Sequence, residues 1–222
     1  MKRVIEIRAA EGGEDSKLFT IDLAQAYQRH FSRVGWINQI VKTLPGEIYI
    51  EVVGKDLTDL EKEAGGHRIQ RVPPTERKGR VHTSTVTVAV INPEIQEIQY
   101  TDADFKIEWY SGTGAGGQHR NKHQNSCRIT HKNSGIVATA QCRSRINSLE
   151  QAKTTLLNQL KSGDRNEQYT ALAIDRKQQV GSGMRGDKIR TYRFQDDVVK
   201  DHNTDKTASV AKIMRGNFDL LW

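Results

Sequence analysis

Alternating apolar and polar residues open the chain and predict a strand at Val4–Arg8. After Gly12 and Gly13, apolar residues recur at helical spacing and predict a helix, with Phe19, Leu23, Ala26, Tyr27 and Val34 on its apolar face. Further runs rich in Val, Ile and Thr predict strands at 36–41, 48–53, 67–72 and 81–91, with a short helix at 57–64. Pro73 and Pro74 stiffen the loop between the last two strands, because each proline fixes φ.

The second half of the chain begins after a segment at 92–104 that indicates a crossing between two domains. The pattern beyond it predicts strands at 105–110 and 189–194, a hairpin at 126–131 and 136–141, and helices at 149–160 and 206–214. The polar, glycine-containing segment 161–185 is expected to be flexible. Short strands and helices in alternation are typical of an α+β fold.

Basic residues outnumber acidic ones, 34 Lys and Arg against 27 Asp and Glu, which gives a net charge of +7 over 222 residues. The excess is concentrated in two segments. Residues 111–160 contain seven Lys or Arg and one acid, and residues 68–82 contain five Lys or Arg and one acid. Clustered cations are typical of nucleic-acid binding, so a phosphate-rich partner is expected. A solvated surface with chance clustering remains the alternative.

Cysteine usage and hydropathy exclude several classes of protein. The two cysteines, Cys127 and Cys142, are expected to face each other across the predicted hairpin as reduced thiols. His119, His123 and His131 near Cys127 have no recognised zinc spacing, so no metal and no other cofactor is predicted. The longest apolar stretches are too short to cross a bilayer and the N-terminus has no signal-peptide core, so a cytoplasmic protein without a membrane partner is expected.

The segment Ser111–Lys122 is unusual because it combines four glycines with a run of polar side chains. Glycines allow a backbone to approach a ligand closely. The Gly-Lys-Ser/Thr sequence of a phosphate-binding P-loop is missing, which argues against that function. The polar residues that follow favour a functional loop over a bare flexible turn: Gln118, His119, Arg120, Asn121, Lys122, and then Arg128, Arg143 and Arg145.

The tetrapeptide Gly116-Gly117-Gln118-His119 resembles the signature of class I peptide chain release factors of the bacterial and organellar type. The similarity extends to Gly66–Glu76, Gly79–Thr85, Arg128–His131 and Lys188–Tyr192, and so covers nearly the whole chain. Pro73-Pro74-Thr75 resembles the Pro-x-Thr tripeptide of the members that read UAA and UAG. The helical domain that precedes the first strand in this family has no counterpart here, so the chain is expected to be a compact version.

The resemblance implies an α+β fold of two domains. A discontinuous codon-recognition domain would comprise residues 1–100 and 189–222, and an inserted α/β domain with the Gly-Gly-Gln loop would comprise residues 101–188. The first would recognise the stop codons UAA and UAG in the ribosomal A site, and the second would promote hydrolysis of peptidyl-tRNA. The residues implied to bind the stop codon are Gly12, Asp15, Gln70, Pro73, Pro74, Thr75, His82 and Thr83.

The implied roles of these codon-binding residues differ. Thr75 would contact the first two bases, and His82 would stack beside the second and separate it from the third. Gln70 and Thr83 would hydrogen-bond the third base, while the backbone at the start of the first helix would contact the uridine. This division suits single-stranded RNA, whose unstacked bases are stacked on rings and read along their edges.

In the other domain, the resemblance implies that Gly116, Gly117 and Gln118 act in catalysis. The backbone N–H of Gln118 would stabilise the developing oxyanion and its side chain would limit access of water. The two glycines would permit the turn, so a side chain at either position is expected to be strained. No stand-alone active site is expected. Gln118 would also be the target of a glutamine methyltransferase.

The implied partners are both ribosomal subunits, the mRNA stop codon, peptidyl-tRNA and ribosomal RNA. The residues implied to bind ribosomal RNA are Arg120, Lys122, Arg128, Arg143 and Arg145. Two other functions remain open. A stop-codon-independent rescue hydrolase for stalled ribosomes would share the Gly-Gly-Gln loop, although the intact Pro-x-Thr tripeptide and His82 argue against it. A non-catalytic RNA-binding regulator could also occupy the A site.

Overall fold

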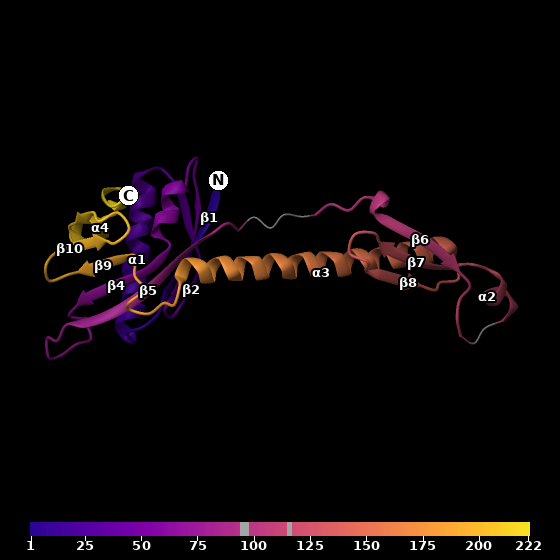
Figure 1. Ribbon diagram of the computed structural model, residues 1–222, viewed down its shortest axis with the longest axis horizontal. Coiled ribbons are helices and arrows are strands. Elements are labelled where there is room, and N and C mark those ends of the chain that lie inside the picture. Colours follow the sequence, from indigo (N-terminus) through magenta and orange to yellow (C-terminus); the bar gives the residue numbers. More distant parts are fainter. Residues whose placement is uncertain (94–97, 115–116) are drawn as a thin grey trace. The chain divides into compact units, whose positions relative to one another are not determined.

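A computed structural model describes residues 1–93, 98–114 and 117–222 and divides the chain into two compact units (Figure 1). The first unit contains Met1–Glu94 and Leu172–Trp222, and the second contains Ile95–Ala171. The chain therefore leaves the first unit, builds the second and returns. The boundaries between the two units lie near residues 94 and 171, whereas the sequence analysis places the domain boundaries near residues 100 and 188.

An eight-stranded sheet with the order β11-β10-β9-β4-β5-β1-β3-β2 forms the centre of the first unit. The pair β4–β9 is parallel and the other pairs are antiparallel. The strands are β1 (Lys2–Ala9), β2 (Ile37–Leu44), β3 (Glu47–Val53), β4 (Gly65–Arg71), β5 (His82–Ile91), β9 (Arg190–Arg193), β10 (Val198–Asp201) and β11 (Thr207–Ala208). The helices of this unit are α1 (Glu14–Arg33), η1 (Thr58–Glu63), α4 (Val210–Met214) and η3 (Phe218–Leu220).

Helix α1 covers one face of this sheet, as Figure 1 shows. Alternation along β1 places Ile5 and Ile7 in the core beneath α1, and Glu6 and Arg8 on the opposite face. The core also contains aromatic residues of α1, among them Phe19, which is fully buried. Burial of each such side chain contributes about 1.5–3 kcal/mol, so the apolar stripe of α1 fixes the helix to the sheet.

A buried ion network fastens the returning segment to this core. The fully buried guanidinium of Arg190 donates to Glu63 Oε2 at 2.5 Å and to Asp201 Oδ2 at 2.8 Å. Glu63 also accepts from the Tyr27 hydroxyl at 2.8 Å and from Trp222 Nε1 at 2.5 Å. Burial acts to raise the pKa of Glu63, but the charges of Arg190 and His67 and the hydrogen bonds from Arg190 and Trp222 together outweigh burial and lower this pKa. The network therefore joins α1, η1, β9, β10 and the C-terminal residue.

The second unit is a three-stranded antiparallel sheet packed against a helix. Its strands, in the order β6-β7-β8, are β6 (Phe105–Tyr110), β7 (Ser126–His131) and β8 (Val137–Ala140). The core is formed by one face of the sheet and by Ala152, Leu156 and Leu160 of α3 (Arg145–Val180). Two short helices, η2 (Asp102–Asp104) and α2 (Gln118–Lys122), complete the unit, so the glycine-containing segment Ser111–Lys122 ends in a helical turn.

Helix α3 continues to Val180, so the expected flexibility of segment 161–185 is wrong. The segment is polar but consists mostly of helix-forming residues, and its glycine at 163 costs only about 1 kcal/mol. Within the first unit, Arg176 makes a bidentate ion pair with Glu6, at 2.5 and 2.6 Å. Gln179 exchanges hydrogen bonds with the backbone of Val90, at 2.7 and 2.9 Å. These contacts, which are distant in sequence, hold the end of the helix.

The C-terminal region also differs from the prediction of one helix at 206–214. Strand β11 occupies 207–208, and α4 begins only at Val210, because Ser209 caps it and Asp197 accepts the Ala211 N–H at 3.0 Å. Strand β10 was not predicted, and it pairs with β9. Its four residues are too few for a periodic pattern to be recognised.

The cysteines do not face each other. Cys127 pairs with Ala140, so Cys142 lies beyond the end of β8, and its thiol contacts Gln151 Oε1 at 2.9 Å. The register of the β7–β8 hairpin is therefore offset from the one that would place the two cysteines opposite each other. Both thiols are free.

Candidate functional site

The residues implied to read the codon lie at one end of the β4–β5 pair. Gln70 lies opposite Thr83, and Arg71 lies opposite His82. Because successive residues of a strand point to opposite faces, Gln70 and Thr83 share the face away from α1, whereas His82 belongs to the α1 face. His82 therefore lies on the opposite face of the β4–β5 pair from Gln70 and Thr83, which the resemblance assigns to the third base.

The start of α1 is joined directly to β5 beside these residues. The Ala10 N–H donates to Thr85 O at 2.9 Å, and the Thr85 N–H donates to Glu11 O at 2.6 Å. Gly12 has a φ of +123°, and a Cβ at this position would lie 2.4 Å from the Cβ of Ser84. Only glycine permits this close approach, so Gly12 places the first turn of α1 next to the end of β5 that carries His82 and Thr83.

The carboxylate of Asp15 is turned inward and is almost fully buried. It accepts from Arg71 Nε at 2.8 Å and from Ser84 Oγ at 2.8 Å. Arg71 also pairs with Asp22 at 2.8 Å and lies over the ring of Phe19. Asp15 therefore ties α1 to both β4 and β5, and only its backbone remains for the contact that the resemblance implies.

The proline loop between β4 and β5 is organised by a residue that the sequence analysis did not select, Glu76. Its side chain is only 5% exposed and accepts from the Lys78 N–H at 2.7 Å, Arg80 Nη2 at 3.0 Å and His82 Nε2 at 2.6 Å. These bonds, first those from Lys78 and His82, lower the pKa of Glu76 to about 2. Because a carboxylate only accepts, Nε2 of His82 carries the proton. The one sequence signal for this role was a single acid within a basic segment.

The loop itself presents its apex to solvent. Pro73 is buried, and its carbonyl accepts the Glu76 N–H at 3.0 Å, which closes a turn. Pro74 and Thr75 occupy the two central positions of that turn and are exposed. The hydroxyl of Thr75 is therefore available to an external partner.

The sequence suggested that the cations of the basic segment 68–82 form one patch, but in the structure they do not. Arg68 and Arg71 lie on opposite faces of the sheet, and Arg71 is held on the α1 side by two acids. The remaining cations, Arg77, Lys78 and Arg80, are exposed in the proline loop. Strand alternation divides what is continuous in the sequence.

In the second unit, Gln118 is the first residue of α2. The first N–H groups of a helix have no acceptor within it, so the Gln118 N–H is free of helical hydrogen bonding. Gly117 is exposed, and a Cβ there would meet no atom of the described residues within 4 Å. The strain expected from a side chain at Gly117 is therefore absent. Gly116 and the side chain of Arg120 lie outside the described residues.

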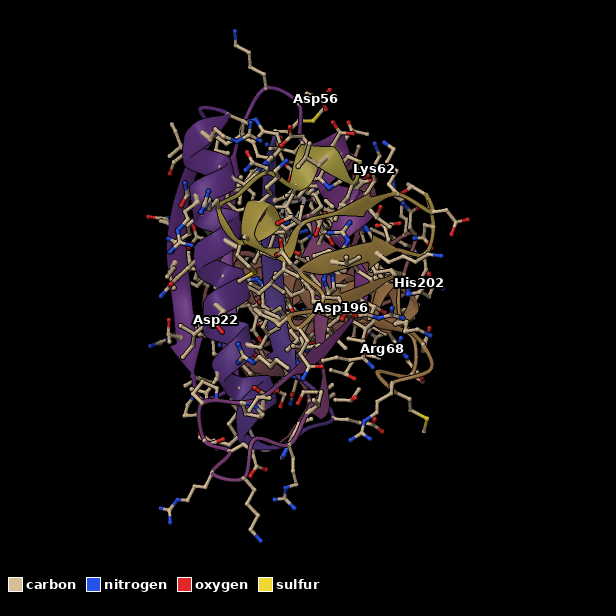
Figure 2. The ribbon with its side chains drawn as sticks, turned by 90° about the vertical axis from the view of Figure 1, so that its left-hand side faces the viewer. Asp22, Asp56, Lys62, Arg68, Asp196 and His202 are labelled. Atoms are coloured by element: carbon tan, nitrogen blue, oxygen red, sulfur yellow. The ribbon has the colours of Figure 1, made fainter. Side chains whose placement is uncertain are left out.

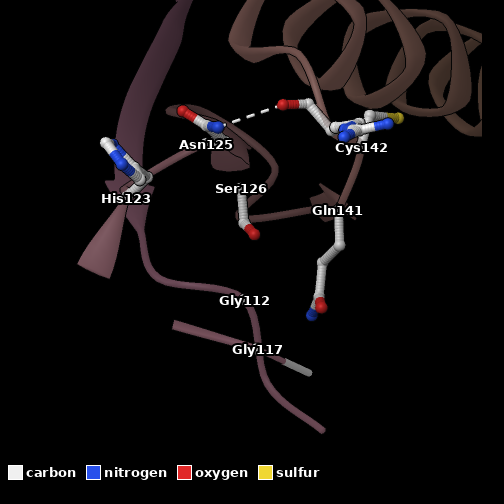
Figure 3. Close-up of a pocket in the computed structure, with 8 residues that line it drawn as sticks. Gly112, Gly117, His123, Asn125, Ser126, Gln141 and Cys142 are labelled. Carbon is white, nitrogen blue, oxygen red and sulfur yellow. Dashed lines mark hydrogen bonds between the residues drawn. The ribbon is translucent and has the colours of Figure 1, made fainter. Parts of the chain in front are cut away.

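Two side chains that the sequence analysis missed hold the ends of the glycine loop. Gln141 accepts the Thr113 N–H at 3.3 Å and donates to its hydroxyl at 3.2 Å. Asn125 donates to Arg143 O at 3.0 Å, as Figure 3 shows. Together with Gly117 and others, these residues line a cavity of about 350 Å³. Neither anchor has a local sequence signal, because each contact joins positions that are far apart along the chain.

The predicted RNA-binding cations of the described residues are all exposed, namely Lys122, Arg128, Arg143 and Arg145. Two of them lie over aromatic rings: Arg145 is 4.1 Å from the ring centre of Trp109, and Arg128 is 5.8 Å from that of Tyr110. Cation–π contact orients a guanidinium without neutralising it. These arginines therefore keep their charge for an external anion.

Searches of the described residues for other kinds of site gave two results. In those parts of the chain, no group of three or more His, Cys, Asp or Glu residues is arranged to hold a metal ion. No helix among them combines the length and the apolar character that crossing a bilayer requires.

Comparison with known proteins matches the PCRF domain over residues 1–88 and the RF-1 domain over residues 93–203. Peptide chain release factor 1 of Albidiferax ferrireducens is 43% identical over 97% of this chain and 62% of its own length. The protein of the same name from Nitrosomonas eutropha is 42% identical over 98% of this chain and 64% of its own length. The chain thus spans a little under two thirds of the length of these relatives.

Among solved structures, RF2 of Thermus thermophilus is similar with a TM-score of 0.56 and 29% identity, over 100% of this chain and 66% of that one. The agreement of both domain matches, the identity along the chain and the α+β fold leads to one assignment. The chain belongs to the class I peptide chain release factor family.

Proposed function

We propose that this chain recognises the stop codons UAA and UAG in the ribosomal A site and promotes hydrolysis of peptidyl-tRNA. One observation carries the proposal: the exposed apex at Pro74 and Thr75, the ring of His82 and the Gln70–Thr83 pair all lie at one end of the β4–β5 pair. These residues offer a ring for stacking and short polar groups for base edges, which is how single-stranded RNA is read. The relatives named peptide chain release factor 1 support the same function.

Glu76 holds the proposed codon-binding residues in a fixed arrangement. It fixes the ring of His82 through a 2.6 Å hydrogen bond and closes the proline loop through the Lys78 N–H. A ring held in this way loses little freedom when a base stacks on it, because its orientation is already set. His82 and the Gln70–Thr83 pair would then contact successive bases from opposite faces of the strand edge.

The hydrolytic step would use the backbone N–H of Gln118. Water attacks the carbonyl carbon of the ester that joins the peptide to tRNA, and negative charge develops on the carbonyl oxygen before the tRNA hydroxyl leaves. A fixed N–H donor at that oxygen stabilises the transition state and is worth about 10²–10³-fold in rate. The space around Gly117 is open, so a requirement for glycine there would come from the docked ribosome rather than from this chain.

Partners follow from the same proposal. Arg120, Lys122, Arg128, Arg143 and Arg145 would bind ribosomal RNA beside the peptidyl-tRNA. The side chain of Gln118 is exposed, which supports its modification by a glutamine methyltransferase. The codon-reading role falls to the first unit and the hydrolytic role to the second.

The test is release of a labelled nascent peptide from ribosomes with UAA, UAG, UGA or an empty A site. We expect release with UAA and UAG only. Release that is equal with an empty A site would favour a stop-codon-independent rescue hydrolase instead. An effect on translation that Gln118→Ala leaves unchanged, without any peptide release, would indicate a non-catalytic RNA-binding regulator.

A further inference from the structure

The sheet face opposite α1 carries a row of polar residues next to the Gln70–Thr83 pair. Arg68 lies two residues before Gln70 on β4 and therefore shares its face. In register, Arg68 is flanked by Thr85 on β5 and by Thr191 on β9, and Thr191 in turn pairs with Lys200 on β10. Four strands thus place polar side chains in one line across the sheet.

Further cations flank this line. Arg193 lies beside Gln70 in the parallel β4–β9 register. His202 shares a 2.9 Å hydrogen bond with the hydroxyl of Thr191. The pKa of His202 is lowered by burial first and then by the charges of Lys188, Lys200 and Arg68, so these groups lie close together. We name this set the cationic band: Arg68, Lys188, Arg193, Lys200 and His202.

Figure 2 shows Arg68 and His202 on the same side of the sheet, with Asp22 of α1 on the other side. The two faces treat positive charge differently. Beneath α1, Arg190 and Arg71 are each paired with two acids. Among the described residues, Arg68, Lys188 and Arg193 form no ion pair, and the Asp205 partner of Lys200 is 82% exposed. Three of the five members of the cationic band are thus without an acidic partner among the described residues, and the acid that pairs with Lys200 is exposed to solvent.

Two buried polar atoms on this face also lack a hydrogen-bond partner within the described part of the chain. They are Nε of Arg68 and Oγ1 of Thr85, on residues that pair directly across β4 and β5. The Thr85 side chain is fully buried. Both atoms are shielded from solvent, so an external anion would meet the charged end of the Arg68 guanidinium rather than these two atoms.

The position of the cationic band narrows the choice of partner. Arg68 of the band lies two residues along β4, about 7 Å, from the Gln70–Thr83 pair that is proposed to hydrogen-bond the third base. An RNA strand whose base is read there must continue past the sheet with its phosphates exposed. Guanidinium groups bind phosphate oxygens in a fork, and an unpaired row of cations suits a chain of phosphates.

We propose that the cationic band binds RNA phosphates adjacent to the third base of the stop codon. This inference rests on the proposed function, because the codon defines where the RNA strand enters. The phosphates belong either to the mRNA downstream of the stop codon or to ribosomal RNA that lines the A site. The chemistry of recognition is the same for both sources.

The test compares two triple variants with the same change in net charge. The first, Arg68→Gln with Arg193→Gln and Lys200→Gln, removes cations from the band. The second, Lys42→Gln with Lys55→Gln and Lys62→Gln, removes exposed lysines elsewhere in the first unit. Thermal unfolding establishes that both are folded. Affinity for UAG-programmed ribosomes is measured by fluorescence anisotropy of the labelled full chain at several salt concentrations, a readout that requires no catalysis.

We expect the band variant to bind more weakly and with a shallower salt dependence than the control variant. Each lost contact to a single-strand phosphate lowers the slope of log affinity against log salt by about 0.7, so three contacts lower it by about 2. Equal affinity and equal slope for the two variants would overturn the inference, as would a weaker affinity with an unchanged slope.

The source of the phosphates is separated by two mRNAs, one that ends at the third base of UAG and one extended by six nucleotides. A loss that appears only with the extended mRNA assigns the band to the message, and an equal loss with both assigns it to ribosomal RNA. The wild-type release assay is run in parallel. If the wild-type chain releases no peptide, the proposed function fails, whereas the anisotropy still decides whether the band binds RNA.

Discussion

The proposed codon-reading end of the first unit and the glycine loop of the second are built in opposite ways. In the first, buried side chains hold the recognition residues: Asp15 joins α1 to two strands, and Glu76 fixes His82. In the second, Gln141 and Asn125 anchor the two ends of the loop, while Gly117 between them is exposed and has room for a Cβ among the described residues. The first region is therefore held in place by contacts within this chain, whereas the described contacts of the glycine loop hold only its ends.

The largest expected effect lies in the glycine loop. Gln118→Pro removes the one N–H that is proposed to stabilise the oxyanion, and proline is well tolerated at the first position of a helix such as α2. We expect peptide release on UAG ribosomes to slow by about 10²–10³-fold at saturating factor. Gln118→Ala keeps the N–H and is the matched control, so its loss should be smaller. Equal losses for Pro and Ala would assign the chemistry to the side chain instead.

The next largest effect concerns the stability of the first unit, which carries the proposed codon-binding residues. His67 is fully buried, its Nε2 donates to Glu63 O at 2.9 Å, and burial with the nearby Arg190 charge lowers its pKa to about 4. The unfolded chain, with a His pKa near 6.5, binds a proton that the folded chain does not. Stability should therefore fall as pH drops from about 6.5 to about 4, by roughly 3 kcal/mol.

Urea unfolding at several pH values measures this loss of stability. Hydrogen exchange of the backbone amides of β4 and β9 at the same pH values provides a second measurement. In His67→Gln the slope between pH 6.5 and 4 should flatten, because the titrating group is gone. A slope that His67→Gln leaves unchanged would show that other groups cause the acid sensitivity of the first unit.

The same substitution made in both regions tests the comparison directly. Gly12→Ala forces a Cβ to within 2.4 Å of Ser84 at a φ of +123°, so it should destabilise the first unit by about 1–3 kcal/mol. Gly117→Ala meets no atom and should change stability by less than about 0.5 kcal/mol. The urea midpoints of the two variants give both values. If Gly117→Ala proved as destabilising as Gly12→Ala, the glycine loop would be internally constrained and the contrast between the regions would be lost.

The smallest expected effect sharpens the role of Glu76. Glu76→Gln keeps the shape of the side chain but removes the charge that binds His82 and the Lys78 N–H. We expect kcat/KM for release at UAA and UAG to fall about tenfold, because the ring loses its fixed orientation. The maximal rate at saturating factor should stay unchanged, since Gln118 is untouched. Glu61→Gln, on an exposed acid, serves as control and should behave as wild type.

Much of the fold could be predicted from periodicity alone. The strand at the N-terminus, the amphipathic α1 and the β6, β7 and β8 strands have patterns that suit only one structure. The polar part of α3 was not predicted although its residues are mostly helix-forming, because it buries no apolar stripe and its contacts with Glu6 and Val90 are remote in sequence. The sequence likewise selected Gln70, His82 and Thr83 together, but it could not assign them to opposite faces without the register of β4 and β5.

The amino-acid sequence alone shows which candidate binding elements the chain contains: a proline-bearing loop, a diglycine followed by glutamine, and clustered cations. The tertiary structure alone decided which of those cations remain available. Arg71 and Arg68 are neighbours in one basic segment, yet one is paired with Asp15 and Asp22 and the other lies in a row without acids. The reason is physical: alternation along a strand sends adjacent side chains to opposite faces, and only folding decides what covers each face.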